Sequence, residues 1–147
     1  MSPSKSNRNV EAADRFHSAA IHALRHVSRE DPASGLTAAR LSALSVLVFG
    51  GAKTLGELAA AERVRPPTMT SIVRGLEREG LVRREADRAD GRIVRVRATA
   101  KGTRILQAAR RRRVAHLAGR LAQLGETEVA RIREAAELVE RALAQEP

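Results

Sequence analysis

Between residues 67 and 78 the chain places small hydroxyl groups and arginines on one face of an expected helix. At 100° per residue, this polar face carries Pro67, Ser71, Arg74 and Arg78, with Thr68 and Thr70 at its flanks. The opposite face carries Met69, Ile72, Val73 and Leu76. Hydroxyl groups near a helix start can approach phosphates and base edges closely, and arginines bond guanine or phosphate. The chemistry that this pattern supports is hydrogen bonding to nucleic acid.

A second polar set lies in the short stretch from Asp87 to Arg92, between two segments that alternate like β-strands. Arg88 and Arg92 on a narrow projecting loop suit the electronegative minor groove of DNA. Asp90 lies between them and cannot attract a polyanion. We expect it to accept hydrogen bonds from Arg92 or from loop amides, and so to fix the shape of the tip.

Other candidate residues carry weaker signals. His22 and His26 have a spacing that two metal ligands on one helix can have, but ordinary surface or interface histidines are the favoured interpretation, and we expect no metal site. Phe16, His17 and Phe49 are candidates for lining a ligand pocket. The run Arg110–Arg113 could contact phosphate, although a solvated helix whose aliphatic stems cover apolar surface is favoured. His116 receives no role.

No paired-carboxylate cleft, nucleophile motif or phosphate-binding loop is recognisable. We therefore expect that the protein is not an enzyme, that it has no catalytic residues and that it binds no cofactor. The absence of cysteine excludes disulfides and thiol-based sensing. No apolar run approaches the length of a membrane span, and no secretory segment follows the polar N-terminus, which predicts a soluble cytoplasmic protein without a membrane partner.

The positive charge is concentrated in one part of the chain. The formal net charge is +10, and residues 62–113 contain 16 Lys and Arg against 6 Asp and Glu, so the remainder is electrically balanced. A basic segment attached to neutral flanks indicates a partner that is a polyanion.

Hydrophobic spacing predicts the elements that position these residues. We expect no regular structure in residues 1–9, then helices over 10–28, from 37 to about 50, over 54–62 and over 66–79. Strands are expected at 81–85 and 93–97, with Val94 and Val96 both facing the packed side. A long helix from 99 to about 124 and a last helix after Gly125 complete the order. The fold class is mainly α with a small β-hairpin, and a helix-turn-helix followed by a hairpin is the winged arrangement.

Several stretches together resemble the MarR family of bacterial transcriptional regulators. They are Thr54–Ala59, Arg65–Thr70, Leu76–Val82, Asp87–Arg92 and Thr99–Gly102. The resemblance implies an obligate homodimer whose first and last helices intertwine, and a palindromic operator read by paired winged domains. It also implies a small ligand, often aromatic or anionic, that binds between the dimerisation and DNA-binding regions and relieves repression, although this chain has no Tyr, Trp or Cys.

These inferences combine into one hypothesis. Residues 1–147 form a single domain, in which 10–30 and 103–145 supply dimerisation helices and 37–100 form the winged helix-turn-helix. The protein is expected to be a homodimeric transcriptional repressor that binds double-stranded DNA at an inverted-repeat operator. The alternative is an architectural DNA-binding protein that tolerates any sequence.

Overall fold

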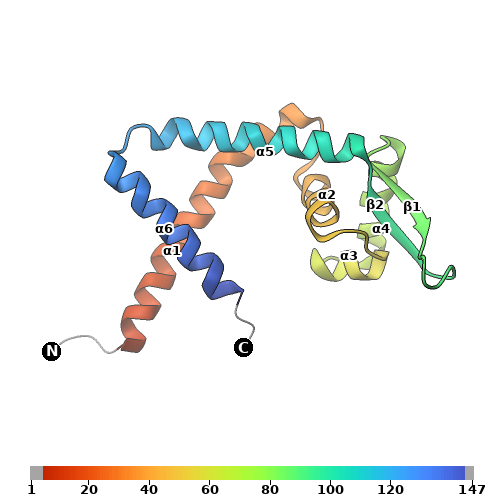
Figure 1. Cartoon of the computed structure of the whole chain (residues 1–147), viewed down its shortest axis with the longest axis horizontal. Helices are drawn as coiled ribbons and strands as arrows, with labels where there is room; N and C mark the ends of the chain where they lie inside the picture. The colour runs from red at the N-terminus through yellow and green to blue at the C-terminus, as the bar shows by residue number, and fades with distance from the viewer. Residues whose placement is uncertain (1–4, 145–147) are drawn as a thin grey trace.

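The computed structural model describes residues 5–144, and Figure 1 shows how their elements are arranged. The helices are α1 (Lys5–Val27), the 3-10 helix η1 (Ser28–Ser34), α2 (Ala38–Gly50), α3 (Leu55–Ala61), α4 (Pro66–Arg78), α5 (Ala100–Leu121) and α6 (Glu126–Leu143). The strands are β1 (Val82–Ala86) and β2 (Val94–Ala98), which pair antiparallel. The expected order of elements and the mainly α class with one hairpin are confirmed.

Side-chain caps fix where the central helices begin. Thr54 accepts a hydrogen bond from the backbone N–H of Glu57, whose carboxylate accepts one from the Thr54 N–H, so the capping box is complete. Thr37 and Thr99 cap α2 and α5 in the same way, each accepting from the N–H three residues on. Pro66 occupies the first turn of α4, where its missing N–H leaves no bond unmade.

A compact apolar core joins α2, α3, α4, the hairpin and the first half of α5. Leu44, Leu58, Met69, Leu76 and Leu81 are all completely buried. With only two aromatic side chains in the chain, branched aliphatic residues fill this core. It holds α3 and α4 as a helix-turn-helix against the hairpin.

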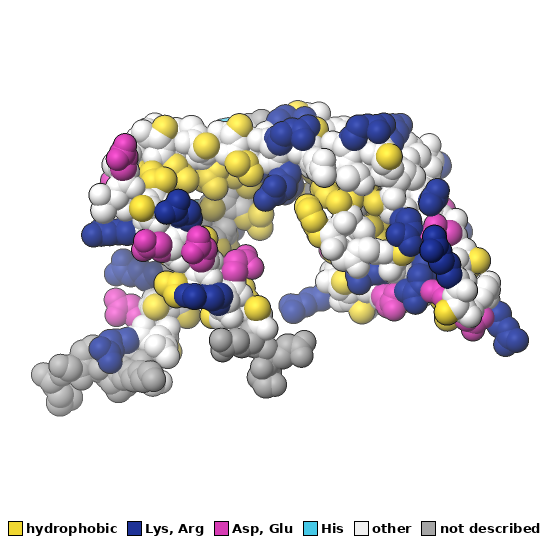
Figure 2. Space-filling model, viewed as in Figure 1, with side chains coloured by type: hydrophobic (Ala, Val, Ile, Leu, Met, Phe, Trp, Pro, Cys, Tyr) yellow, Lys and Arg dark blue, Asp and Glu magenta, His cyan; other side chains and the backbone are white. Residues whose placement is uncertain are grey.

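Figure 1 shows that α5 extends from this core and carries α1 and α6 on the other side of the molecule. No residue of α6 is buried within the described chain. Its exposed apolar residues are Val129, Ile132, Leu138 and Leu143, and α1 exposes Val10, Phe16 and Leu24. In Figure 2 apolar side chains gather in the hollow below α5 on this side. The terminal helices therefore present an apolar surface that the described residues of the chain do not cover.

Two expectations from the sequence are wrong, one about the start of the first helix and one about the burial of Val94. The first helix begins at Lys5 instead of residue 10, so Lys5–Asn9 is helical, while residues 1–4 and 145–147 lie outside the described part. Val94 is half exposed although it shares a face with buried Val96. The reason is that β2 extends past the core toward the loop, where no apolar partner covers its outer end.

His26 of α1 meets His116 of α5, with 2.9 Å between their Nε2 atoms. His22, one turn earlier on α1, is exposed and takes no part in this contact. Burial lowers the pKa of His26, and His116, Arg120 and Arg29 act in the same direction. No group of three or more potential metal ligands occurs among the described residues. The pair joins α1 to α5.

Gly102 lets α5 approach the hairpin closely. A Cβ on this residue would collide with the backbone carbonyl of Leu81, which cannot move without displacing the start of the hairpin. We therefore expect Gly102→Ala to lower the free energy of unfolding by about 1–3 kcal/mol, the usual cost of overpacking. Urea unfolding measures this difference.

The matched control is Gly119→Ala in the same helix, where a Cβ would meet no atom within 4 Å. Alanine favours helix over glycine, so this variant should be as stable as the parent or slightly more stable. Equal stability of the two variants would contradict the proposed close contact at Gly102.

Candidate nucleic-acid interface

The second helix of the helix-turn-helix, α4, separates its residues as the spacing predicts. Met69, Val73 and Leu76 are completely buried, and Ile72 is half-buried. The residues of its outer face, Pro67, Thr68, Ser71, Arg74 and Arg78, are all exposed. Pro67, Thr70, Ser71, Arg74, Glu77 and Arg78 line a shallow hollow in the surface.

Thr70 departs from the rest of this face. It is half-buried, and its hydroxyl donates to the backbone carbonyl of Pro66 at 3.0 Å. This bond turns the hydroxyl toward the first turn of α4. The exposed side chains of Thr68, Ser71, Arg74 and Arg78 therefore remain available to a ligand in front of the helix, whereas the hydroxyl proton of Thr70 is already used.

The loop between β1 and β2 is shaped by two aspartates. Asp90 accepts a hydrogen bond from the N–H of Arg92 at 3.0 Å, as expected for a residue that fixes the tip. Asp87 accepts bonds from the N–H groups of Ala89 and Asp90 and pairs with the guanidinium of Arg95. The Arg95 and backbone hydrogen bonds lower the pKa of Asp87 to about 2. Arg88 and Arg92 lie exposed on this tip.

Sequence reasoning missed the role of Asp87. The signal was available, because an aspartate at the first position of a tight loop can accept the amide two residues later. What no local pattern gives is the partner, Arg95, which also bonds Glu57 at 3.0 Å. Glu57 belongs to the capping box of α3, so one arginine joins the base of the loop to the helix-turn-helix.

Each acidic residue of the basic segment 62–113 accepts a hydrogen bond within the chain. Glu77 pairs with Arg84, Glu79 with Arg40, Glu85 with Arg97 and Asp87 with Arg95, while Glu62 accepts from Ser42 and Asp90 from Arg92. Arg74, Arg78, Arg88 and Arg92 form no ion pair in the part of the chain that the structure describes. Figure 2 shows Lys and Arg side chains gathered over the hairpin end. The uncompensated charge thus faces outward from α4 and the loop.

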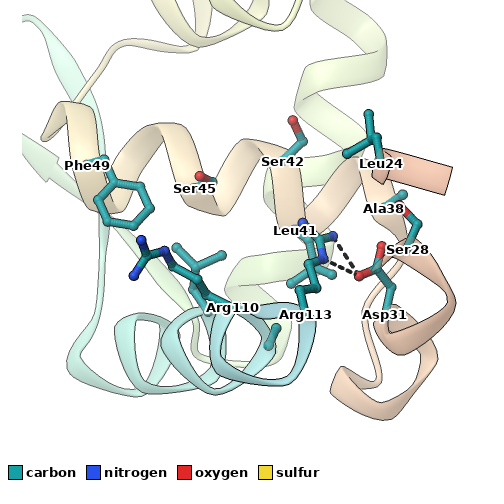
Figure 3. A pocket seen from close by; sticks show the side chains of 12 residues that line it. Leu24, Ser28, Asp31, Ala38, Leu41, Ser42, Ser45, Phe49, Arg110 and Arg113 are labelled. Atoms are coloured by element: carbon teal, nitrogen blue, oxygen red, sulfur yellow. Dashed lines mark hydrogen bonds and ion pairs between the residues drawn. The ribbon is translucent and has the colours of Figure 1, made fainter. Parts of the chain in front are cut away.

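A cavity of about 460 Å³ lies between α2, α5 and the segment where α1 passes into η1 (Figure 3). It is lined by Leu24 and Ser28, by Asp31, by Ala38, Leu41, Ser42, Ser45 and Phe49 of α2, and by Leu106, Ala109, Arg110 and Arg113 of α5. Figure 3 shows Phe49 and Arg110 together at one end and the Asp31–Arg113 ion pair at the other.

Of the three residues expected to line a ligand pocket, only Phe49 lines this cavity. Phe16 and His17 lie exposed on α1, outside the cavity lining. In the arginine run, Arg110 and Arg111 are exposed, as the solvated arrangement predicts, but two members also make contacts that it did not predict. Arg113 pairs with nearly buried Asp31 at 2.6 Å, and Arg110 lines the cavity. These contacts join residues far apart in the sequence, which helical spacing alone does not reveal.

The geometry agrees with two independent comparisons of sequence. A model of the MarR family matches residues 36–94. An HTH-type transcriptional regulator of Mycobacterium bovis is 42% identical over 115 residues, which are 78% of this chain and 80% of the relative. One of Mycobacterium leprae is 39% identical over 82% of this chain and 85% of the relative. The chain belongs to the MarR family.

Solved structures of bacterial proteins have the same arrangement of elements. A MarR family protein from Bacillus stearothermophilus superimposes with a TM-score of 0.80 at 23% identity, covering 97% of this chain and all of that one. A putative transcriptional regulator from Pseudomonas aeruginosa gives 0.77 at 30% identity, covering 98% and 100%. The winged helix-turn-helix fold is therefore that of MarR proteins, and this chain is a DNA-binding transcriptional regulator of the family. No helix in the described residues is long and apolar enough to cross a membrane.

The Asp87–Arg95 pair gives a prediction with a defined pH dependence. Because the pKa of Asp87 is lowered from its ordinary value to about 2, its ionised form stabilises the folded state fully above about pH 4. This contribution is lost as the pH falls through the lowered value. We expect Asp87→Asn to be less stable than the parent at pH 7, and the two unfolding free energies to converge between about pH 4 and pH 2. Urea unfolding across this range measures the difference.

Asp14→Asn on exposed α1 removes the same charge and should leave the unfolding free energy unchanged over the same range. A deficit of Asp87→Asn that stays constant down to pH 2 would contradict the role of the carboxylate charge.

Proposed function

We propose that this MarR protein is a homodimeric repressor that binds an inverted-repeat operator and is released by a small molecule. The observation that carries the DNA-reading part is the outward polar face of α4 beside the arginine-bearing loop tip. A helix of this kind enters the major groove, and the loop reaches a neighbouring groove. Ser71 and Arg74 read or clamp the major groove, and Arg88 and Arg92 contact the minor groove or its phosphates.

Dimerisation is supported by the apolar residues that α1 and α6 leave uncovered. A contiguous apolar surface of this kind marks an interface. In a two-fold dimer the same patch covers itself, and the two copies of α4 are held about one turn of DNA apart, near 34 Å. The operator is then an inverted repeat.

The cavity is the proposed effector site. Arg110 beside Phe49 suits a ligand that combines an anionic group with an aromatic or other flat apolar part. Because the cavity lies between α2 of the DNA-binding region and α5, which carries the terminal helices, its occupant can alter how the two regions are held. The protein controls transcription by covering DNA, without bond-making chemistry.

A sequence-tolerant architectural binder is the second candidate, and the net charge of +10 favours it. The two candidates differ in what Arg74 does. If Arg74 contacts a base, Arg74→Ala should lower operator affinity roughly five- to hundredfold and relax the preference at particular base pairs. Selection of bound sequences from random DNA, first with the parent and then with the variant, measures both effects.

Arg15→Ala is the matched control, because it removes the same charge from an exposed position on α1. It should select the same inverted repeat as the parent. Equal affinity of the parent for all sequences, with Arg74→Ala weakening each of them alike, would instead establish the architectural candidate.

The dimer is tested separately in α6. Ile132 is exposed in the protomer, so Ile132→Asp should leave the fold of the winged region intact while placing a charge in the proposed interface. Sedimentation at micromolar concentration should give a dimer for the parent, about twice 15.9 kDa, and a monomer for the variant. A monomeric parent would refute the dimer.

A further inference from the structure

The C-terminal end of α4 is held from two neighbouring helices. Arg40 of α2 donates from Nη1 to Glu79 Oε1 at 2.7 Å, and Lys101 of α5 donates from Nζ to the Glu79 carbonyl at 2.7 Å. Thr99 donates its hydroxyl to the carbonyl of Gly80, also at 2.7 Å. The last carbonyls of a helix lack intrahelical partners and carry partial negative charge, so Lys101 and Thr99 satisfy carbonyls that the end of α4 leaves open, while Arg40 bonds the Glu79 carboxylate.

Arg40 does more than pair with a surface carboxylate. Its guanidinium lies against the backbone of α4 at Gly75, so closely that a Cβ there would come within 2.5–2.9 Å of three guanidinium atoms. Gly75 is buried and lies in the interior of the helix, a position where glycine costs helix stability relative to alanine. The space that Gly75 leaves is filled by Arg40, whose side chain is 28% exposed.

The position of this contact matters for DNA reading. Gly75 follows Arg74 directly and lies one turn after Ser71, so the Arg40 contact fixes the rotation of the turn that carries both side chains. Met69 and Leu76 bury the helix in the core, but apolar contacts are non-directional. The planar guanidinium, seated on Gly75 and bonded to Glu79, adds a directional constraint.

We propose that Arg40 is a positioning residue that sets the rotation of α4 and thereby the discrimination of the operator from other DNA. The inference rests on the proposed sequence-specific function. It assigns Arg40 no contact with DNA: the side chain acts through α4.

The test compares Arg40→Ala, Gly75→Ala and the double variant. The three atoms nearest to an added Cβ at Gly75 all belong to the end of the flexible Arg40 side chain, so Gly75→Ala should fold and displace the guanidinium. Each single variant should lower the ratio of operator affinity to random-DNA affinity roughly five- to tenfold, comparable to one lost base contact. Because both remove the same contact, the double variant should lose no more than Arg40→Ala alone.

Three readouts separate positioning from other roles. Random-DNA affinity and the slope of log affinity against log salt should stay at the parent values, whereas loss of a phosphate contact would lower both, the slope by about one. Circular dichroism melting checks that the variants are folded under the binding conditions. Arg15→Ala on α1 loses the same charge, and its ratio should equal that of the parent.

An unchanged affinity ratio in folded Arg40→Ala would overturn the inference while leaving the proposed function standing. A lower salt slope with uniform weakening would also overturn it, because Arg40 would then contact DNA directly. Additive losses in the double variant would show that Gly75 and Arg40 act separately and would overturn it as well. If the parent protein itself bound operator and random DNA with nearly equal affinity, the proposed function would be overturned and, with it, this inference.

Discussion

Met69, Val73 and Leu76 lie on one face of α4 and are completely buried. Because this face packs against the core, the opposite face of the helix, with Ser71 and Arg74, lies on the outside. Burying side chains of this size stabilises the fold by about 1.5–3 kcal/mol each. The apolar face is therefore strong enough to fix which face of α4 remains outward. The core helices, the hairpin and the first half of α5 are arranged around this requirement, since they supply the residues that cover the buried face.

Electrostatics then refine the surface that packing has exposed. In a segment with many arginines, a carboxylate without a partner would weaken the attraction for a polyanion. Here the carboxylates of Glu77, Glu79, Glu85 and Asp87 are all bonded to arginines, and these bonds also hold elements together. Arg95 illustrates both effects, because it compensates Asp87 and ties the loop to Glu57. The internal ion pairs shape the frame, and the remaining arginines supply the outward charge.

Local sequence patterns predicted most of the fold and the outward face of α4. Capping at Thr54 and Thr99, the proline at the start of α4 and the change of hydrophobic period after Gly80 all act within a few residues. The contacts that escaped prediction join distant segments: Asp31 with Arg113, His26 with His116 and Arg40 with Glu79. A period of 3.6 or 2 tells which face of an element is buried, but it does not tell what lies against that face. The same limit explains the exposure of Val94. The alternation assigns it to the correct face of β2, the face of buried Val96, but its end of the strand lies beyond the core.

The cavity and α4 are mechanically related through the helices that they share. Leu41 and Ser42 on α2 line the cavity, and Arg40, which directly precedes them, bonds Glu79 at the end of α4. On α5, Leu106 lines the cavity and Lys101 holds the Glu79 carbonyl. Both walls of the cavity are thus also supports of α4. A ligand changes such an arrangement only to the extent that it binds one separation of α2 and α5 better than another. Arg40 of α2 and Lys101 of α5 both bond Glu79 at the end of α4. A change in the separation of α2 and α5 must therefore alter at least one of these two contacts, and the rotation of α4 changes with it.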